Sequence, residues 1–477
     1  MRSATINFLL LSVSLLVSNL TVAQSPWKHG RLHVTPDKSG LQYADGTPFF
    51  WLGDTAWELL NRLTTEEVVA YFDNRVKKGF NVIQITGLSP ESFKRANRYG
   101  QQPLYDGDPL KPNEKYYARL DTIVNLALER QLVIGLVVTW GDKVVRVPGY
   151  GTDPVIFNEG NAKIFGAWMG NRYGQYANII WILGGDVAPV SKEGDFRPVW
   201  RAMANGIVSV TGNDQLMTYH PSGYQSSSKW FHDERWLDFN MIQSSHGERD
   251  APNWDFVASD LMRTPKKPTL DAEPNYEDHP VHPWPKWDPD SGYFRDYDVR
   301  KQLYRSVFSG AFGVTYGHHA LWQFVSERDE VVNFAERGWR NALDRPGADQ
   351  VRYLRYLMES HPLDGRVRDL SLIAEGQGSS KKDHAEAFYG MSHNYALIYL
   401  PIGRRVTVDA SGMTGKLVKS YWFDPRTGAV AGNSPVQKSS AMTFAPPSIG
   451  PGNDWVLIIE DAKSNFPNFV SYKNERR

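Results

Sequence analysis

The strongest constraint on the fold is a regular alternation of short β-branched runs with longer stretches of helical periodicity, from about Phe49 to Phe324. Such alternation predicts βα units built around a parallel sheet. The predicted strands cover residues 49–54, 81–86, 132–139, 178–183, 215–219, 239–243, 268–272 and 313–316. The predicted helices cover residues 64–78, 117–131, 164–176, 199–211, 299–309 and 347–358. Eight strands within this length predict an α/β fold of the (β/α)8 TIM-barrel type.

A doubly wound open sheet is the alternative arrangement for the same alternation. It usually carries a glycine-rich turn after the first strand, where a nucleotide phosphate binds. Here that turn reads Leu-Gly-Asp-Thr-Ala-Trp over residues 52–57, which is not such a loop. The sequence therefore favours the barrel.

The pattern changes to short alternating runs at hairpin spacing between about Leu370 and Asp461. This spacing predicts a small all-β sandwich. We expect a signal peptide over residues 1–24, the barrel over 25–365 and the sandwich over 366–477. Because no long low-complexity linker separates the last two, they are expected to pack against each other.

The N-terminal residues have the features of a secretory signal peptide. Arg2 precedes an apolar run from Phe8 to Val22, and Ala23 provides a small residue for cleavage. A membrane anchor is the alternative, but the run is too short and too interrupted to cross about 30 Å of hydrocarbon. The sequence predicts export, either to the periplasm or out of the cell.

Composition limits the chemistry that is available. The chain has no cysteine, which excludes disulfides, thiolate nucleophiles and Cys-ligated metals. Its 53 basic residues balance 53 acidic ones, so no nucleic-acid partner is expected. Aromatic residues make up 13%, including 16 Trp and 23 Tyr, and such side chains suit stacking on sugar rings. We expect an oligosaccharide substrate, no cofactor, no membrane partner and a monomer.

Polar and aromatic residues follow the predicted strands at the end where barrel enzymes hold their active sites. Acidic, His and Trp residues recur there, and a purely structural role for them predicts no such bias. The candidate substrate contacts are Asp54, Trp57, Trp140, His220, His246, Tyr276, His319 and Trp322.

Asp186 and Glu273 are the candidate catalytic residues, because they follow the fourth and seventh strands and should face each other across the barrel mouth. Glycoside hydrolysis needs such a pair of carboxyl groups, one protonated and one ionised. A separation of about 5–5.5 Å leads to retention of configuration, and about 6.5–9.5 Å to inversion. The alternatives are a helix N-cap for Asp186 and a salt bridge for Glu273.

A metal-dependent hydrolase is a further alternative, since several histidines also end strands. That chemistry usually begins with His-x-His after the first strand, and this strand ends in Gly-Asp-Thr. No His-Glu-x-x-His occurs either. No metal site is therefore predicted. The loop over residues 277–300, rich in aromatic residues and proline, is either a substrate wall or packed onto the barrel.

Four segments resemble glycoside hydrolase family 140: Trp-Leu-Gly-Asp-Thr-Ala-Trp at 51–57, Gly-Gly-Asp at 184–186, Glu-Pro-Asn-Tyr-Glu at 273–277 and Thr-Tyr-Gly-His-His at 315–319. The resemblance covers nearly the whole mature chain. It implies a barrel enzyme of Bacteroidetes pectin degradation that acts as an apiosidase on rhamnogalacturonan II, with a C-terminal domain of the collagen-binding type. A β-sandwich alone implies no such binding.

By the same resemblance, Asp186 is the general acid/base and Glu273 the nucleophile of a retaining mechanism. Related barrels carry Asn-Glu after the fourth strand, whereas this chain has Gly-Asp there. The shorter Asp186 side chain must therefore be brought closer to the substrate by its backbone. Two other functions stay open: a non-catalytic carbohydrate-binding or adhesion protein, and a glycosidase of the same fold with a different sugar specificity.

Overall fold

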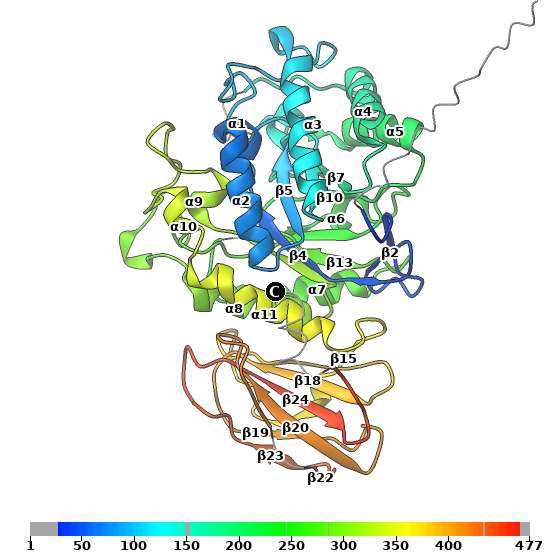
Figure 1. The fold of residues 1–477 in the computed structure, drawn as a ribbon, viewed down its shortest axis with the longest axis vertical. Helices are drawn as coiled ribbons and strands as arrows, with labels where there is room; N and C mark the ends of the chain where they lie inside the picture. Colours follow the sequence, from blue (N-terminus) through cyan, green and yellow to red (C-terminus); the bar gives the residue numbers. More distant parts are fainter. Residues whose placement is uncertain (1–26, 148–152, 245, 285, 433–434, 468–477) are drawn as a thin grey trace, which may run out of the picture.

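The computed structural model describes residues 27–147, 153–244, 246–284, 286–432 and 435–467 (Figure 1). The predicted signal peptide lies outside the described residues. Within the described part of the chain, no helix is both long and apolar enough to cross a membrane.

Eight parallel strands form the predicted barrel. They are β4 Trp51–Thr55, β5 Val82–Thr86, β6 Val133–Val137, β7 Ile179–Gly184, β10 Met217–His220, β12 Asn240–Gln243, β13 Thr269–Asp271 and β14 Gly313–Tyr316. They lie in the order β10-β7-β6-β5-β4-β14-β13-β12, with the short antiparallel β11 (Gln225–Ser226) beside β12. Between β10 and β12, Asp238 N–H donates to Met217 O (2.9 Å), and the Thr218 hydroxyl donates to Phe239 O (2.7 Å). These bonds close the sheet, which confirms the barrel.

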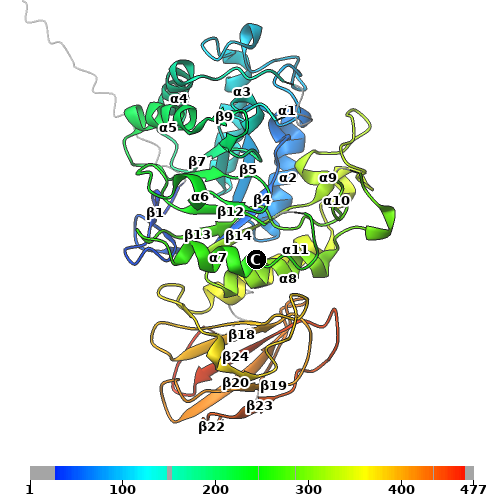
Figure 2. The same cartoon turned by 180° about the vertical axis from the view of Figure 1, so that it is seen from behind.

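Helices cover the outside of the barrel (Figures 1 and 2). The longer ones are α2 Thr65–Lys77, α3 Glu114–Glu129, α4 Glu159–Tyr173, α5 Arg197–Thr211, α7 Asn253–Leu261, α8 Asp296–Phe308 and α11 Pro346–Glu359. Single turns are α1 Leu59–Arg62, α6 Ser228–Phe231, α9 His319–Trp322 and α10 Trp339–Ala342. α2 begins with a capping box, in which the Thr64 hydroxyl accepts from Glu67 N–H and the Glu67 carboxylate accepts from Thr64 N–H. The sequence did not predict α7.

The first predicted strand, 49–54, is divided in the structure. Pro48–Phe49 forms β3 of a small antiparallel sheet with β1 (Leu32–Val34) and β2 (Leu41–Tyr43), and the barrel strand β4 begins only at Trp51. Residues 49–52 are all apolar, so the sequence pattern contains no signal that separates β3 from β4.

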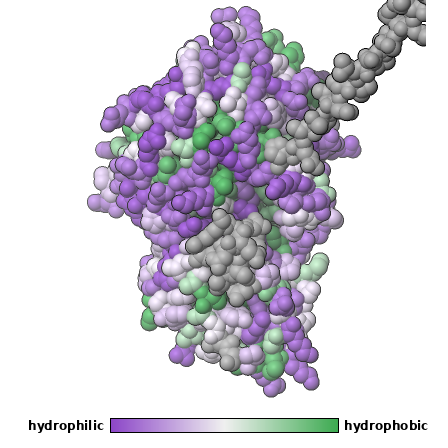
Figure 3. Space-filling model, in the orientation of Figure 1, coloured by the Kyte–Doolittle hydropathy of each residue, from purple (hydrophilic) through white to green (hydrophobic). Residues whose placement is uncertain are grey.

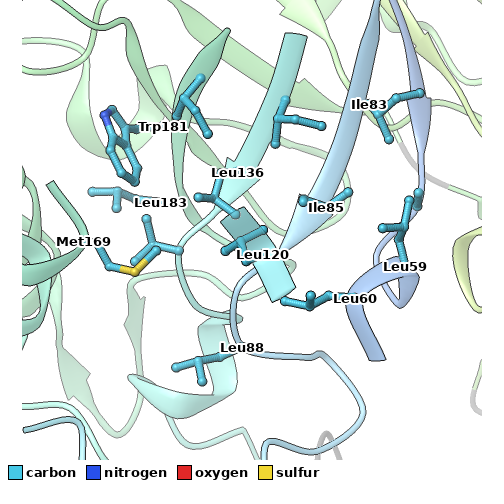
Figure 4. Close-up of a cluster of buried hydrophobic side chains, with 14 of the residues drawn as sticks. Leu59, Leu60, Ile83, Ile85, Leu88, Leu120, Leu136, Met169, Trp181 and Leu183 are labelled. Carbon is cyan, nitrogen blue, oxygen red and sulfur yellow. The ribbon is translucent and has the colours of Figure 1, made fainter. Parts of the chain in front are cut away.

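Strand alternation divides the barrel core into two layers. Ile83 and Ile85 of β5 point outward and pack with Leu60, Leu120 and other side chains of the surrounding helices (Figure 4). The alternate residue Val82 belongs to the inner cluster, and Gln84 spans the barrel interior to donate to Ala272 O (3.2 Å). Side chains of the inner layer therefore connect strands on opposite sides of the barrel.

The C-terminal domain consists of two antiparallel sheets, as predicted. The larger contains β15 Val367–Arg368, β17 Glu386–Tyr389, β18 Tyr395–Leu400, β24 Trp455–Asp461, β20 Leu417–Phe423, β21 Val430–Gly432 and β22 Val436–Gln437. The smaller contains β16 Ile373–Glu375, β19 Val406–Val408 and β23 Met442–Phe444. Figure 1 shows this domain packed under α8 and α11 of the barrel.

The two domains share a buried apolar core, and a buried ion pair joins them. Leu303 and Leu354 of the barrel belong to the same apolar cluster as Leu397 of the sandwich. Within it, Arg300 of α8 donates to both oxygens of Asp454 (Nε–Oδ2 2.9 Å and Nη2–Oδ1 2.7 Å). The domains are therefore packed, as expected from the absence of a linker.

Replacing Asp454 with Ala is expected to destabilise the protein by about 3–5 kcal/mol, because the buried Arg300 guanidinium loses its two-bond carboxylate partner and keeps only Asp296, 3.3 Å from Nη1, as an acidic neighbour. The free energy of unfolding from denaturant titration measures this change. As a control, Glu375→Ala on the exposed edge strand β16 should cost no more than about 0.5 kcal/mol. Equal stability of the two variants would contradict a structural role for the interdomain ion pair.

Candidate active site

A cleft of about 790 Å³ opens at the C-terminal ends of the barrel strands. Both candidate carboxylates, Asp186 and Glu273, line it. The other lining residues are Trp57, Pro90, Glu91, Ser92, Arg95, Trp140, Gly223, Tyr224, Gln243, His246, Gly247, Tyr276, His279, His282, Trp284, Trp322, Glu330, Val332 and Asn333. Five of these residues had been predicted as substrate contacts: Trp57, Trp140, His246, Tyr276 and Trp322.

Glu273 lies two residues beyond β13 and is only 6% exposed. Two imidazoles contact its carboxylate: His220 Nε2 is 2.8 Å from Oε2, and His246 Nε2 is 3.1 Å from Oε1. Burial favours the protonated acid, but the hydrogen bonds from these imidazoles outweigh it and lower the pKa of Glu273 to about 2. Glu273 is thus an ionised carboxylate within the cleft.

Asp186 is positioned by an unusual backbone. Gly184 (φ +86°), Gly185 (φ +121°) and Asp186 (φ +53°) all adopt positive φ after β7. A Cβ on Gly184 would lie 2.3 Å from His220 O, and one on Gly185 would lie 2.8 Å from the Trp140 ring. Only glycine fits at these two positions. This turn places Asp186 in the lining of the cleft.

His220 connects the segments that carry the two carboxylates. It is fully buried and is not among the described residues that line the cleft. Its Nε2 contacts Glu273, and its Nδ1 lies 3.4 Å from the backbone nitrogen of Asp186. The rings of Trp57 and Trp140 pack against it at centroid distances of 5.5 and 5.9 Å. The structure thus places His220 behind Glu273, where it can orient the carboxylate.

Asp54 and His319 are likewise absent from the described lining of the cleft. Asp54 is buried on the outer side of β4, where Tyr71 donates to it (2.5 Å) and Arg75 Nη1 lies 3.3 Å away. His319 supports the cleft wall, since its Nδ1 accepts from the Trp322 indole (3.2 Å) and its Nε2 donates to Asn333 O (2.7 Å). The contacts of Asp54 and His319 thus indicate that both residues hold neighbouring segments of the protein in place.

The described residues of the loop over 277–300 fall into two groups, one that lines the cleft and one that packs on the protein. His279, His282 and Trp284 line the cleft. By contrast, Trp287 packs on Tyr293 and Phe334, at centroid distances of 4.9 and 5.1 Å. The first part of the loop therefore forms cleft wall, and the later part packs on the protein.

Sequence reasoning missed the polar residues that other loops bring to the cleft. Arg95 follows β5 and Glu330 follows β14, and their side chains approach to 3.6 Å at the cleft. Gln243 at the end of β12 and Tyr224 before β11 also line it. Gln243 carried a signal, because it ends a predicted strand. A single sequence contains no signal for the pairing of Arg95 with Glu330, which lie more than two hundred residues apart in the chain.

Among the described residues, no group of three or more His, Asp or Glu side chains is placed to hold a metal ion. The histidines near the cleft pair with carboxylates, carbonyl oxygens or each other, as the contacts of His246, His279 and His319 show.

Solved structures define the class of protein. A glycoside hydrolase family 5 structure from Bacteroides vulgatus ATCC 8482 is 34% identical, with a TM-score of 0.84 over 93% of this chain and 96% of that one. A second structure, described as a glycoside hydrolase, is 33% identical, with a TM-score of 0.83 over 93% and 99% of the two chains. The protein is a glycoside hydrolase.

Family models give a narrower assignment. The model described as "Apiosidase-like, catalytic domain" matches residues 35–364, so the chain belongs to the apiosidase-like family. Residues 367–460 match the model described as "Putative collagen-binding domain of a collagenase". Among curated proteins, none matches this chain.

Proposed function

We propose that the protein is a retaining glycoside hydrolase of plant pectic glycans, and in its sharpest form an apiosidase that cleaves the apiose linkage to the rhamnogalacturonan II backbone. Glu273 is the nucleophile and Asp186 the general acid/base. The observation that carries this proposal is the cleft itself: an ionised Glu273, contacted by two imidazoles, lines it together with Asp186.

The proposed reaction is a double displacement, which rests on the resemblance to retaining glycoside hydrolases and on the presence of both carboxyl groups in the cleft. Ionised Glu273 attacks the anomeric carbon while protonated Asp186 gives its proton to the leaving oxygen, which breaks the glycosidic bond and forms a glycosyl ester on Glu273. Asp186, now ionised, then takes a proton from water, and the resulting oxygen nucleophile releases the sugar and regenerates Glu273. The pKa of Glu273, lowered to about 2, keeps the nucleophile charged throughout the ordinary pH range.

Aromatic side chains on several sides of the cleft support a sugar ligand. Trp57 and Trp140 meet edge to face at 5.3 Å, and Tyr276 packs on His246 at 4.4 Å. Their apolar ring surfaces suit the C–H faces of a sugar, whereas the carboxylates and imidazoles suit its hydroxyls. The choice of apiose rests on the apiosidase-like catalytic domain.

For localisation and assembly, we propose an exported monomer that acts in the periplasm or outside the cell, on the strength of the N-terminal sequence pattern. On the face of the molecule in Figure 3, hydrophilic residues predominate and hydrophobic ones form small scattered groups. Among the described residues that are visible on this face, no broad apolar surface for a second copy is seen.

Replacing His220 with Phe is expected to move the acidic limb of the kcat/KM profile to higher pH. The phenyl ring keeps the packing on Trp57 and Trp140, but the contact with Glu273 Oε2 is lost. Because the pKa of Glu273 is depressed to about 2 by this contact and that of His246, its removal raises the pKa. The carboxylate then becomes protonated, and activity is lost, at a higher pH than in the native enzyme.

The pH dependence of kcat/KM between about pH 3 and 8 measures this shift, with the retained fold checked by circular dichroism. His232→Phe, at a buried histidine outside the cleft lining, serves as the control and should leave the limb in place. An acidic limb that is unchanged in His220→Phe would show that His220 does not set the ionisation of Glu273.

The proposed substrate is tested by incubating the mature protein with apiose-containing oligosaccharides of rhamnogalacturonan II. Mass spectrometry should detect a released fragment with apiose at its new reducing end. If no apiose linkage is cut while another plant glycan is, the sugar assignment fails but the glycosidase assignment stands.

A further inference from the structure

His279 has a fixed tautomer in the cleft wall. Its Nδ1 lies 2.7 Å from Pro280 O, and because a carbonyl oxygen only accepts, Nδ1 carries the proton. Nε2 of a neutral imidazole is then an acceptor. Burial, together with the neighbouring His246 and His319, lowers the pKa of His279 far below its usual range, so the ring stays neutral. His279 therefore offers an acceptor and no second donor.

Two other side chains of the cleft, unlike His279, carry polar atoms that are buried without a hydrogen-bond partner. His246 donates from Nε2 to Glu273 Oε1 (3.1 Å), and its Nδ1, which is the acceptor of the tautomer that carries the proton on Nε2, is buried and unpaired. The side-chain oxygen of Gln243, at the end of β12, is also buried and unpaired. Both residues are less than 5% exposed and line the cleft.

These groups lie around the candidate nucleophile. His279 stacks on His246 with ring centroids 4.3 Å apart, and His246 in turn bonds to Glu273. Gln243 precedes His246 by three residues on the same strand end. An unmatched buried acceptor costs free energy, so a cluster of them beside a cleft indicates a ligand that brings donors.

We infer that Gln243, His246 and His279 form a hydroxyl-recognition subsite beside Glu273, which accepts hydrogen bonds from free hydroxyl groups of the sugar that becomes attached to the enzyme. This inference rests on the proposed glycosidase function and adds the residues that select the sugar. A site of acceptors discriminates against a sugar whose hydroxyl is absent or etherified, because the buried acceptor then stays unpaired. Gln243 and His279 are thereby assigned as specificity-determining residues.

The test combines protein variants with deoxygenated substrates. His279→Phe keeps a ring between His246 and His319 but removes Nε2, and Gln243→Met keeps the side-chain length but removes the amide. The probes are an aryl apioside and its analogues, each lacking one hydroxyl. Each variant should lower kcat/KM on the full substrate by about 5- to 150-fold. Tyr293→Phe, which removes a hydroxyl from the same loop outside the cleft lining, should keep native activity.

The expected result is non-additivity. Removing the sugar hydroxyl that faces His279 should reduce kcat/KM for the native enzyme by the same factor as His279→Phe, and should cost the variant no more than about twofold further. The same should hold for a second hydroxyl with Gln243→Met. If removal of each hydroxyl lowers kcat/KM by the same factor in the native enzyme and in the variants, the proposed subsite is wrong.

The proposed apiose specificity can be wrong while the proposed subsite is correct, and the two outcomes can be distinguished. If the native enzyme cleaves no apioside, the same comparison is made with deoxy analogues of the aryl glycoside that it does cleave, and non-additivity there supports the subsite. If the native enzyme cleaves no glycoside at all, both the function and the subsite are overturned.

Discussion

Glu273→Gln is expected to reduce turnover by on the order of 10⁴-fold or more, because the amide cannot form the glycosyl ester on which a double displacement depends. Gln has nearly the same shape as Glu, and its amide oxygen can still accept from one of the two imidazoles that contact Glu273. The fold should therefore survive the substitution, and the loss should lie in kcat.

The measurement is kcat on an aryl glycoside, with circular dichroism and thermal unfolding to confirm the fold. Glu277→Gln is a matched control, since Glu277 lies four residues away in a buried site outside the cleft lining. Burial raises the pKa of Glu277 to about 7, so a neutral amide resembles its native state, and activity should stay within a few-fold. Appreciable turnover by Glu273→Gln would remove it as nucleophile.

Asp186→Asn is expected to slow the cleavage of substrates with poor leaving groups by about 10²–10⁴-fold, because these need a proton at the departing oxygen. Activated aryl glycosides, which leave as stable phenolates, should be affected much less in the glycosylation step. The variant suits this test, since Asn tolerates positive φ as well as Asp does, and the turn at φ +53° should persist.

The comparison requires kcat/KM for an oligosaccharide and for a dinitrophenyl glycoside with the native enzyme and the variant. A selective loss on the oligosaccharide supports the acid role. An equal loss on both substrates would mean that Asp186 acts elsewhere in the reaction, or only positions other groups.

The most informative sequence feature for locating the site was the position of polar residues directly after the predicted strands. A (β/α)8 barrel directs the residues that follow its strands to one mouth, so Asp186 after β7 and Glu273 after β13 were expected in one cleft, and both line it. The predicted strand 313–316 coincides with β14, and the other predicted barrel strands differ from the observed ones by a few residues at their ends.

Asp54 was wrongly predicted to face the cleft, because alternate residues of a β-strand face opposite sides of the barrel wall. Trp51 belongs to the inner cluster of the barrel, and on a strand the alternate residues Leu52 and Asp54 must face outward. Asp54 accordingly meets Tyr71 and Arg75 of α2. Counting in twos from Trp51 would have placed it correctly.

Contacts between distant loops could not be predicted from the sequence. Whether His319 or Trp322 faces the cleft depends on the bond of His319 to Asn333 O, which the fold of the loop after β14 determines. The unpaired acceptors of Gln243 and His246 likewise appear only when every neighbouring donor is known. Such features belong to three-dimensional packing and have no local signature.

The two-step mechanism through Glu273 is tested most directly by the stereochemistry of the first product. Proton NMR during hydrolysis of an aryl apioside, or of the glycoside that the enzyme cleaves best, records the anomer before mutarotation. A double displacement through Glu273 is expected to release the first sugar in the same anomeric configuration as the substrate. Initial release of the opposite anomer would show a single displacement by water and would contradict Glu273 as the nucleophile.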